Sequence, residues 1–412
     1  MPQSLANFDN ALKENYAPGL RNAVNNSNVV WAEAIKNEDD IIGEEAVWTI
    51  HSGRSNSTGA RAELSTLPTA DRQRQIKARR GLTYQYHTIK VSGPAKHLTR
   101  GDEGAFARAL ETEIKGAEKD LKNDMSRQVF GQAVTVAASL QTGVLGTLSA
   151  DPGAAVLTFA SEDESVMRHF FPGMLLAIIN PADGATRAGS SSVEVLSVDK
   201  AARTVTLTAA ANAAVATGDF VVRASADGGN SLNDEIDGLR YLLSASGTYA
   251  GIDPTTNPVW KSVAVGSTTT GVSEVIFDEA VEAVETDGSG DSPELFVAEY
   301  VQRRKLASLL QAQKRYDGRD TTLTSGWKGL SLARGTLVAD RYCPTTYFFG
   351  IHQPELQKFV GLDFQWDEDD GKVLYKALDG SDAVEARFKG YVQLAATVRN
   401  AHVVGRLSNP TF

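Results

Sequence analysis

The chemistry most concentrated in this sequence is positive charge, in the ten residues RQRQIKARRG at positions 72–81. Five of them are basic: Arg72, Arg74, Lys77, Arg79 and Arg80. From Asp71 to Arg100 there are eight Lys or Arg and one acid, a net charge of +7, in a chain whose formal net charge is -10. The remainder, with 33 basic and 50 acidic residues, is therefore at -17. This asymmetry predicts a segment that meets something acidic: nucleic acid, a membrane surface or the acidic remainder of the protein itself.

Side chains that could support catalysis are present but not grouped. The sequence has no GxxxxGK[ST] phosphate loop, no GxGxxG after a strand and no GxSxG elbow, which argues against a nucleotide enzyme. Cys343 could act as a nucleophile with His352 or His402, but a lone thiol is more typical of a small buried hydrophobe. The adjacent carboxylates Asp369 and Asp370 would point to opposite faces of a strand, so they form no shared acid–base site. We expect a protein without enzymatic activity.

Metal and cofactor sites are not predicted either. The six histidines are scattered without an HxxxH pair, and the single cysteine leaves no zinc-binding spacing. The stretch WDEDDGKVLYKA resembles a calcium loop, but placing Gly371 at its sixth position puts Trp366 first and Ala377 twelfth, where oxygen ligands are required. An acidic turn between strands is the simpler interpretation.

Length and composition predict an ordinary globular protein. The 412 residues are 42% hydrophobic and 22% charged, enough for two or three domains with real cores. No apolar run approaches the roughly 20 residues of a membrane helix. The N-terminus lacks the pattern of a secretory signal, so we expect a soluble protein made in the cytoplasm, without a membrane partner.

Two alternating segments, AVWTIHS at 46–52 and LTYQYHTIKVS at 82–92, predict the strands that hold the basic run. They enclose about thirty residues rich in Gly, Ser and charge, and loops of this length are uncommon unless functional or disordered. We therefore predict an extended hairpin that reaches away from its own body. Because a hairpin alone is marginal in water, its ladder is expected to rest on another molecule or domain.

The rest of the chain predicts an α+β protein. Apolar residues at steps of three and four predict one long amphipathic helix from Thr99 to about 130, ending before Gly131. Residues 153–226 have few charges and strand–turn–strand patterns, which predict an inserted β domain. A helix, strand and helix follow between 272 and 316, and the C-terminal part predicts two more strands.

Three stretches carry a resemblance to the major capsid proteins of tailed bacteriophages with the Hong Kong 97 fold, of the actinobacterial-phage type. The most specific is NDEIDGLRYLLSASGTYAGIDPTTNPVWKS at 233–262, which is similar to the family's "GL..L....G...GI......W" segment. The others are PELFVAEYVQRRKLASLLQAQKRY at 293–316 and DRYCPTTYFFGI at 340–351, the latter followed by an acidic turn and the closing RNAHVV strand. The likeness runs over nearly the full length.

The resemblance implies a division of the chain into seven parts. These are an N-terminal arm at 1–43, an extended loop at 44–93, a peripheral domain with its spine helix at 94–152, an inserted β-barrel-like domain at 153–226, a peripheral/axial connection at 227–262, a mainly axial domain at 263–362 and C-terminal strands that return to the peripheral domain at 363–412. The inserted domain departs from the minimal family pattern, so its role and orientation stay open.

The resemblance also implies function. Subunits would assemble into hexamers and pentamers of an icosahedral shell around packaged double-stranded DNA, with a scaffold protein and a portal as partners, and a decoration or minor capsid protein as a further one. The shell would form in the host bacterial cytoplasm and become the virion capsid. The extended loop would lie on a neighbouring subunit, so its five basic residues become candidates for intersubunit contact. Some family members crosslink a loop lysine, but no motif identifies a partner for Lys77, and that chemistry is not carried over.

Two alternatives remain open on the residues alone. The basic run could bind nucleic acid, although it lacks a recognition-helix pattern. The inserted β domain could bind a carbohydrate or another surface. The arrangement of the run, at the end of an overlong hairpin in an acidic chain, favours an arm that docks on a neighbouring copy.

Overall fold

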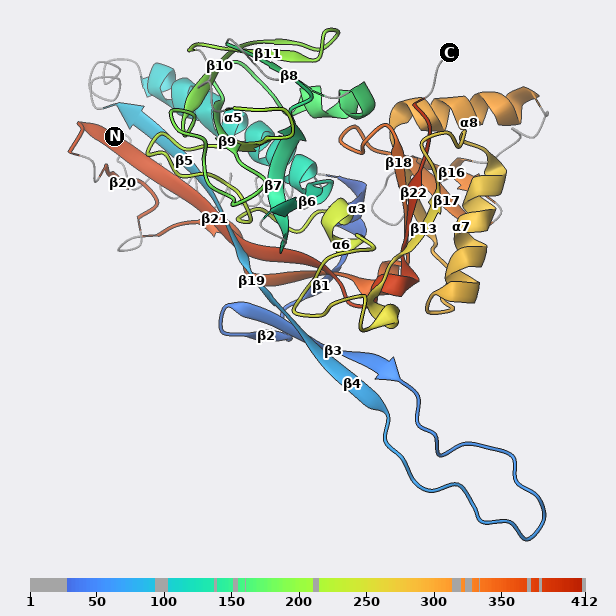
Figure 1. The fold of residues 1–412 in the computed structure, drawn as a ribbon. Coiled ribbons are helices and arrows are strands. Elements are labelled where there is room, and N and C mark those ends of the chain that lie inside the picture. Colours follow the sequence, from blue (N-terminus) through green and yellow to red (C-terminus); the bar gives the residue numbers. More distant parts are fainter. Residues whose placement is uncertain are drawn as a thin grey trace.

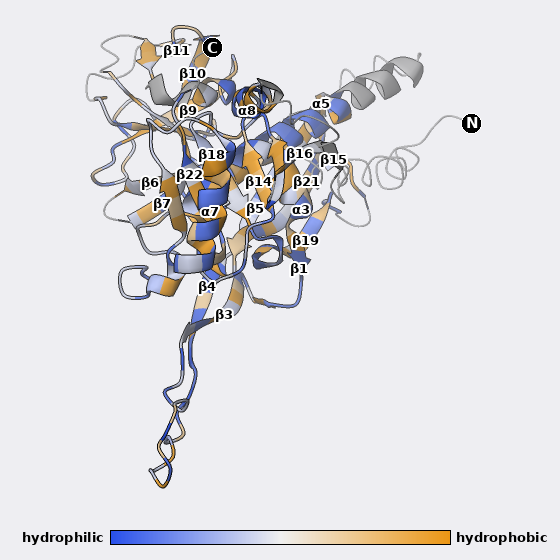
Figure 2. Ribbon diagram, turned by 90° about the vertical axis from the view of Figure 1, so that its right-hand side faces the viewer, coloured by the Kyte–Doolittle hydropathy of each residue, from blue (hydrophilic) through white to orange (hydrophobic). Residues whose placement is uncertain are grey.

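The most conspicuous feature of the fold is an antiparallel hairpin that projects far from the body (Figure 1), and Figure 2 shows the same projection after a 90° turn. The computed structural model describes residues 28–92, 103–136, 139–150, 155–159, 161–209, 215–312, 320–322, 328–332, 334–368, 372–377 and 380–409. Strand β3 (Glu45–Gly53) pairs with β4 (Arg74–Gly81), and the short β2 (Ile41–Ile42) lies on the other edge of β3. Residues 54–73 form the tip and contain no strand. We call β3, β4 and this tip the extended hairpin.

The predicted hairpin is confirmed for its first strand and wrong for its second. Ala46, Trp48 and Ile50 are buried on one face of β3, as their alternation predicts. Their partners, however, come from the basic run itself, which forms β4 rather than a loop. Within the run, Ile76 and Ala78 alternate with charged residues, so the period of two is present but masked by charge.

The segment LTYQYHTIKVS instead belongs to the body. It forms β5 (Thr83–Ser92), which pairs along its whole length with β21 (Ala383–Ala396). Strands β1 (Ile35–Asn37), β19 (Leu356–Trp366) and β20 (Tyr375–Lys376) complete this body sheet. Thr83 and Ile89 are buried on one face of β5. The other face carries Tyr84 and Tyr86, which are exposed and contact Tyr391 edge-on instead of lying in a packed interior.

The long helix is confirmed as α5 (Glu103–Val129), about 40 Å of helix at 1.5 Å per residue. It ends before Gly131 as predicted, while its expected capping residue Thr99 lies outside the described residues. Ile114, Leu121 and Met125 on its apolar stripe are buried in the same core cluster as Ile89 of β5. A hydrogen bond between the side chains of Gln85 and Gln128 joins the helix to the body sheet.

The inserted β domain is a small closed sheet. Its strands run in the order β6 (Gln132–Val136), β7 (Ser139–Thr147), β12 (Phe220–Arg223), β9 (Leu175–Ile179), β10 (Val193–Asp199), β11 (Thr204–Leu207) and β8 (Val156–Thr158). A bridge between Leu148, just after β7, and Phe159, just after β8, joins the last strand in this order to the second. The six strands from β7 to β8 therefore enclose a core of their own. The 3-10 helix η3 (Ser161–Arg168) adds Val166 and Met167 to this core. The sheet begins at Gln132, earlier than the expected boundary at 153, because β6 and β7 supply its first two strands.

A further seven-stranded sheet, here the distal sheet, lies beside two helices. Its order is β13 (Val263–Gly266), β22 (Val403–Arg406), β18 (Tyr347–Ile351), β14 (Leu295–Ala298), β17 (Gly335–Ala339), β16 (Lys328–Leu332) and β15 (Asp320–Thr322). Helices α7 (Glu274–Asp287) and α8 (Tyr300–Ala312) flank it in Figure 1. The helix–strand–helix pattern predicted from the sequence is confirmed.

The C-terminal strands do not stay together as expected. β21 lies in the body sheet, but β22 is hydrogen-bonded between β13 and β18 of the distal sheet. A short 3-10 turn, η6 (Arg399–Ala401), separates them and redirects the chain. The region 363–412 therefore ties both sheets together rather than returning only to the first.

The N-terminal segment that begins at Asn28 packs into the core through α3, whereas Ile35 and Lys36 of β1 are exposed. Helix α3 (Val29–Glu33) is capped by the side chain of Asn28, and Trp31 is fully buried. The buried carboxylate of Asp340 accepts backbone hydrogen bonds from Tyr342 and Val29 and so joins this segment to the strand end at Ala339. Burial raises the pKa of Asp340 to about 6, and these two hydrogen bonds limit the rise.

Asp340 gives the fold a testable pH dependence. Its folded-state pKa lies above that of an unfolded aspartate, so the folded chain holds the proton more tightly and loses stability as pH rises through 6. Between pH 5 and 7 this effect should lower the free energy of unfolding by about 1 kcal/mol. The measurement is urea unfolding of the native protein and of Asp340→Asn at pH 5, 6 and 7. The difference between their free energies of unfolding should change with pH, because asparagine does not titrate. A difference that stays constant over this range would contradict the assignment.

Candidate functional site

The extended hairpin is held at its base by aromatic packing on the body. The indole of Trp48 stacks on Phe359 of β19 with ring centroids 5.5 Å apart and lies 6.4 Å from the ring of Trp260. The backbone N–H of Arg79 donates to the carbonyl of Ala250, 3.2 Å away. The expectation that the ladder rests on another domain is thus met within the chain itself.

A buried ion pair adds a second anchor. Arg80 donates from Nε and Nη2 to the two carboxylate oxygens of Asp237, both at 2.7 Å, and its guanidinium lies 5.3 Å from the ring centroid of Tyr241. The Arg80 side chain is 20% exposed and that of Asp237 is 0% exposed. Burial alone disfavours the charge on Arg80, but the Asp237 carboxylate outweighs it and the pKa of Arg80 rises above its usual range. Burial raises the pKa of Asp237, and Arg80 opposes that rise.

Gln393 completes the anchor. Its side-chain carbonyl accepts the backbone N–H of Asp237 at 2.9 Å, and its side-chain amide donates to the carbonyl of Gly81 at 3.1 Å. Strand β21, the end of β4 and the segment before Gly238 therefore meet at one fully buried amide. These contacts fix the direction in which the hairpin leaves the body.

The other four basic residues point into solvent. Arg72, Arg74, Lys77 and Arg79 are all exposed, and Arg79 makes only a long 3.5 Å contact with Glu45. The tip adds two apolar side chains in the open, Leu64 at 103% and Leu67 at 79% exposure. The structure thus divides the predicted site. Arg80 is used inside the chain, whereas the remaining four are exposed, with Arg74 on the opposite side of β4 from Lys77 and Arg79. These four residues together are called the outer basic face below.

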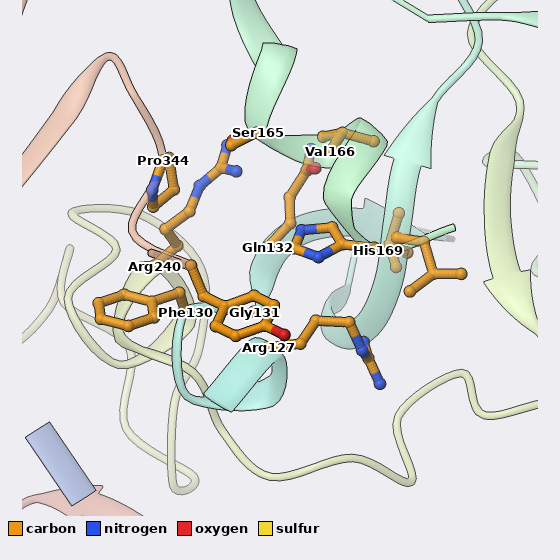
Figure 3. A pocket seen from close by; sticks show the side chains of 12 residues that line it. Arg127, Phe130, Gly131, Gln132, Ser165, Val166, His169, Arg240 and Pro344 are labelled. Carbon is orange, nitrogen blue, oxygen red and sulfur yellow. The ribbon is translucent and has the colours of Figure 1, made fainter. Parts of the chain in front are cut away.

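A small cavity lies at the junction of the inserted β domain with α5 and the distal sheet (Figure 3). Its volume is about 20 Å³, room for about one water molecule. Two buried atoms that line it, Gln132 Oε1 and His169 Nδ1, have no hydrogen-bond partner among the described residues. Arg127 at its edge is bound by Glu235 and Asp124.

The cavity does not have the properties of an active site. Burial, with nearby Arg127, lowers the pKa of His169 to about 3, which makes it a poor general base at neutral pH.

Cys343 is fully buried as predicted, and burial raises the pKa of its thiol well above the usual range. The described part of the chain holds no group of three or more potential metal ligands and no helix long and apolar enough to cross a bilayer.

No protein-family model and no curated protein sequence matches this chain. Its structure is similar to the cyanophage A-1(L) capsid asymmetric unit, with a TM-score of 0.53 and 13% identity over 92% of this chain and 91% of that one. The chain has the Hong Kong 97 capsid fold. Weaker similarities include the virus-like particle from Pyrococcus furiosus (TM-score 0.43, 10% identity, 96% and 99% covered) and Gordonia phage Cozz (TM-score 0.42, 11% identity, 92% and 86% covered).

The extended hairpin and α5 lie where the resemblance predicts the extended loop and the spine helix. The sequence identified the five basic residues of the loop but missed the groups that hold it, above all Asp237, Gln393 and Trp260. Asp237 carried a weak signal, because it stands between the apolar residues Ile236 and Leu239, although Asp234 and Glu235 precede them. A carboxylate buried with such neighbours requires a partner. Gln393 carried none, because an amide in a strand looks like any solvated residue.

Proposed function

We propose that this chain is the major capsid protein of a tailed bacteriophage, which assembles into hexamers and pentamers of an icosahedral shell around double-stranded DNA. The observation that carries the proposal is the extended hairpin, a projection anchored at its base that exposes the outer basic face along β4 and two leucines at its tip. Ordered apolar and charged side chains so far from any core of their own are stabilised when another molecule covers them. A second copy supplies negative charge, because its residues outside 71–100 carry a formal net charge of -17.

The proposal includes partners and location. A scaffold protein and a portal would direct closure of the shell, and a decoration or minor capsid protein would bind it from outside. The inner surface would lie near packaged DNA without sequence-specific contact. Assembly would take place in the host bacterial cytoplasm, the product would be the virion capsid, and the chain would perform no catalysis.

Neutralising the outer basic face tests this role. The variant Arg72→Ser, Arg74→Ser, Lys77→Ser and Arg79→Ser should leave the subunit folded, because none of these side chains is buried. It should lose rings and shells, as seen by electron microscopy of protein co-expressed with its scaffold, because the contact with the next copy is removed. Substituting four lysines that are exposed elsewhere, Lys119, Lys122, Lys200 and Lys376, with serine removes the same number of charges and controls for net charge. A native protein that never forms rings or shells would refute the proposal.

A second function, nucleic-acid binding through the outer basic face, is favoured by the same four exposed cations. Four phosphate contacts would give a salt slope of about -4 in a plot of log binding constant against log salt concentration. Shells that form normally in the serine variant but retain less DNA would support this function over docking.

A further inference from the structure

The distal sheet carries an acidic surface at one end. From Glu274 to Gln302 there are nine Asp or Glu and no Lys or Arg. The inner side of α7 is apolar and buried, so its acids face outwards. Glu282, Asp287 and Asp291 are exposed at its last turns and in the loop that follows. These three residues are here the acidic end.

The helix dipole makes this position unfavourable for acids. The C-terminus of a helix carries partial negative charge, which cations stabilise and anions oppose. α7 has no basic residue in its last turn. Within the chain, Arg334 pairs with Glu285 of α7 at 3.3 Å, but Glu282, Asp287 and Asp291 have no ion pair among the described residues. The charge of the acidic end therefore weakens the isolated subunit slightly, and positive charge from another copy would compensate it.

Helix α8 carries a basic surface, while its N-terminus is stabilised by Glu299, which accepts the backbone N–H of Val301. It begins at Tyr300, and Arg303, Arg304 and Lys305 follow within its first two turns, near the partial positive charge of a helix N-terminus. Buried Leu306 and Leu310 mark its inner side. The outer side exposes Arg304 together with two apolar residues, Tyr300 at 51% and Leu309 at 42% exposure.

These two charged surfaces lie at opposite ends of the distal sheet. Contacts near the two ends of strand β22 show this. Near the start of β22, the backbone N–H of Ser289, just after α7, donates to the carbonyl of Asn400. Beyond its other end, the side chain of Gln302 in α8 donates to the carbonyl of Ser408. Figure 1 shows the same arrangement, with α8 across one end of the sheet and α7 running along it towards the other.

Two complementary surfaces at opposite ends of one domain cannot pair within a subunit but can pair between subunits. A contact that joins different surfaces of identical copies is heterologous, and it closes into a ring when its rotation allows. We propose that the outer side of α8 in one copy binds the acidic end of α7 in the next copy around a capsomer ring. This inference rests on the proposed shell function and names the surface, distinct from the extended hairpin, that closes the ring.

The contact would work through several weak, screened charge pairs and a small apolar area. Each exposed ion pair contributes about 0–1 kcal/mol, so a ring depends on their repetition and on ionic strength. Rising salt should therefore weaken the effect of charge reversal at these positions.

Complementary charge reversal tests the pairing. One variant carries Asp287→Lys and Asp291→Lys, another Arg304→Glu and Lys305→Glu, and a third carries all four changes. In the full chain co-expressed with its scaffold, each two-residue variant should put about tenfold fewer subunits into rings and shells at low salt, and the four-residue variant should recover most of them. A variant with Glu194→Lys and Asp234→Lys, exposed acids away from the distal sheet, matches the charge change of the first and should assemble normally.

The outcomes separate this inference from the proposed function. If native protein forms shells and the two-residue variants do so equally well, the α8–α7 contact is refuted and the shell function stands. If circular dichroism shows that the four-residue variant is folded, yet it assembles no better than either two-residue variant, the pairing is likewise refuted. If native protein never assembles, the shell function fails and this contact fails with it.

Discussion

Replacing Arg80 by alanine is expected to lower the free energy of unfolding by about 3–5 kcal/mol, because it leaves the Asp237 carboxylate buried without its partner. Asp237 is wholly inaccessible and receives both hydrogen bonds of the guanidinium. Urea unfolding followed by tryptophan fluorescence measures the loss, and Trp48 and Trp260 lie at the same junction. Arg79→Ala, one residue earlier in β4, is the matched control and should change stability by less than about 0.5 kcal/mol.

Two further measurements identify the cause of that loss. Adding Asp237→Asn to Arg80→Ala removes the stranded charge and should recover part of the stability. Lowering the pH should also reduce the cost of Arg80→Ala, since burial raises the pKa of Asp237 and a protonated carboxyl carries no charge. A cost for Arg80→Ala no larger than that for Arg79→Ala would show that the pair is not an anchor.

Replacing Gly238 by alanine should destabilise the protein by about 3 kcal/mol, at the upper end of the usual cost of overpacking. An added Cβ would lie 2.3 Å from the backbone nitrogen of Gly131 and 2.6 Å from the carbonyl oxygen of Gln128. Both are backbone atoms at the end of α5, so no side chain can rotate away. Thermal unfolding measures the effect.

A glycine within α5 provides a control of opposite sign. At Gly116 an added Cβ meets nothing within 4 Å, so Gly116→Ala should stabilise the helix by up to about 1 kcal/mol. If Gly238→Ala were as stable as the native protein, the close approach of its segment to the spine helix would be wrong. The close approach gives a physical reason for a glycine at position 238, where the Gly-Leu pair of the 233–262 segment stands.

Both predictions concern how the body directs the extended hairpin. A projection held by Arg80, Trp48 and Gln393 loses less conformational entropy on docking than a flexible loop would, and this favours association. The same arrangement lets the outer basic face be altered without unfolding the subunit. Anchoring and docking can therefore be separated by mutation, although they belong to one run of ten residues.

The sequence by itself determined the elements with a clear period and a local signal. The 27-residue α5, strand β3, the helix–strand–helix around β14 and a β domain between α5 and α6 (Leu239–Leu242) all follow from apolar spacing and turn residues. The resemblance of 233–262 to a capsid segment identified the fold before any geometry. The unequal distribution of charge identified the hairpin as the part to test.

Only the tertiary structure decided which strands pair and which charges are used. The partner of β5 is β21, about 300 residues later, and β22 leaves β21 for another sheet; nothing in a local pattern specifies such non-local pairing. Arg79 and Arg80 are equivalent in the sequence, but adjacent residues in a strand face opposite sides. Arg79 therefore faces solvent, whereas Arg80 reaches a carboxylate 157 positions away, and that alternation decides which of the two anchors the hairpin.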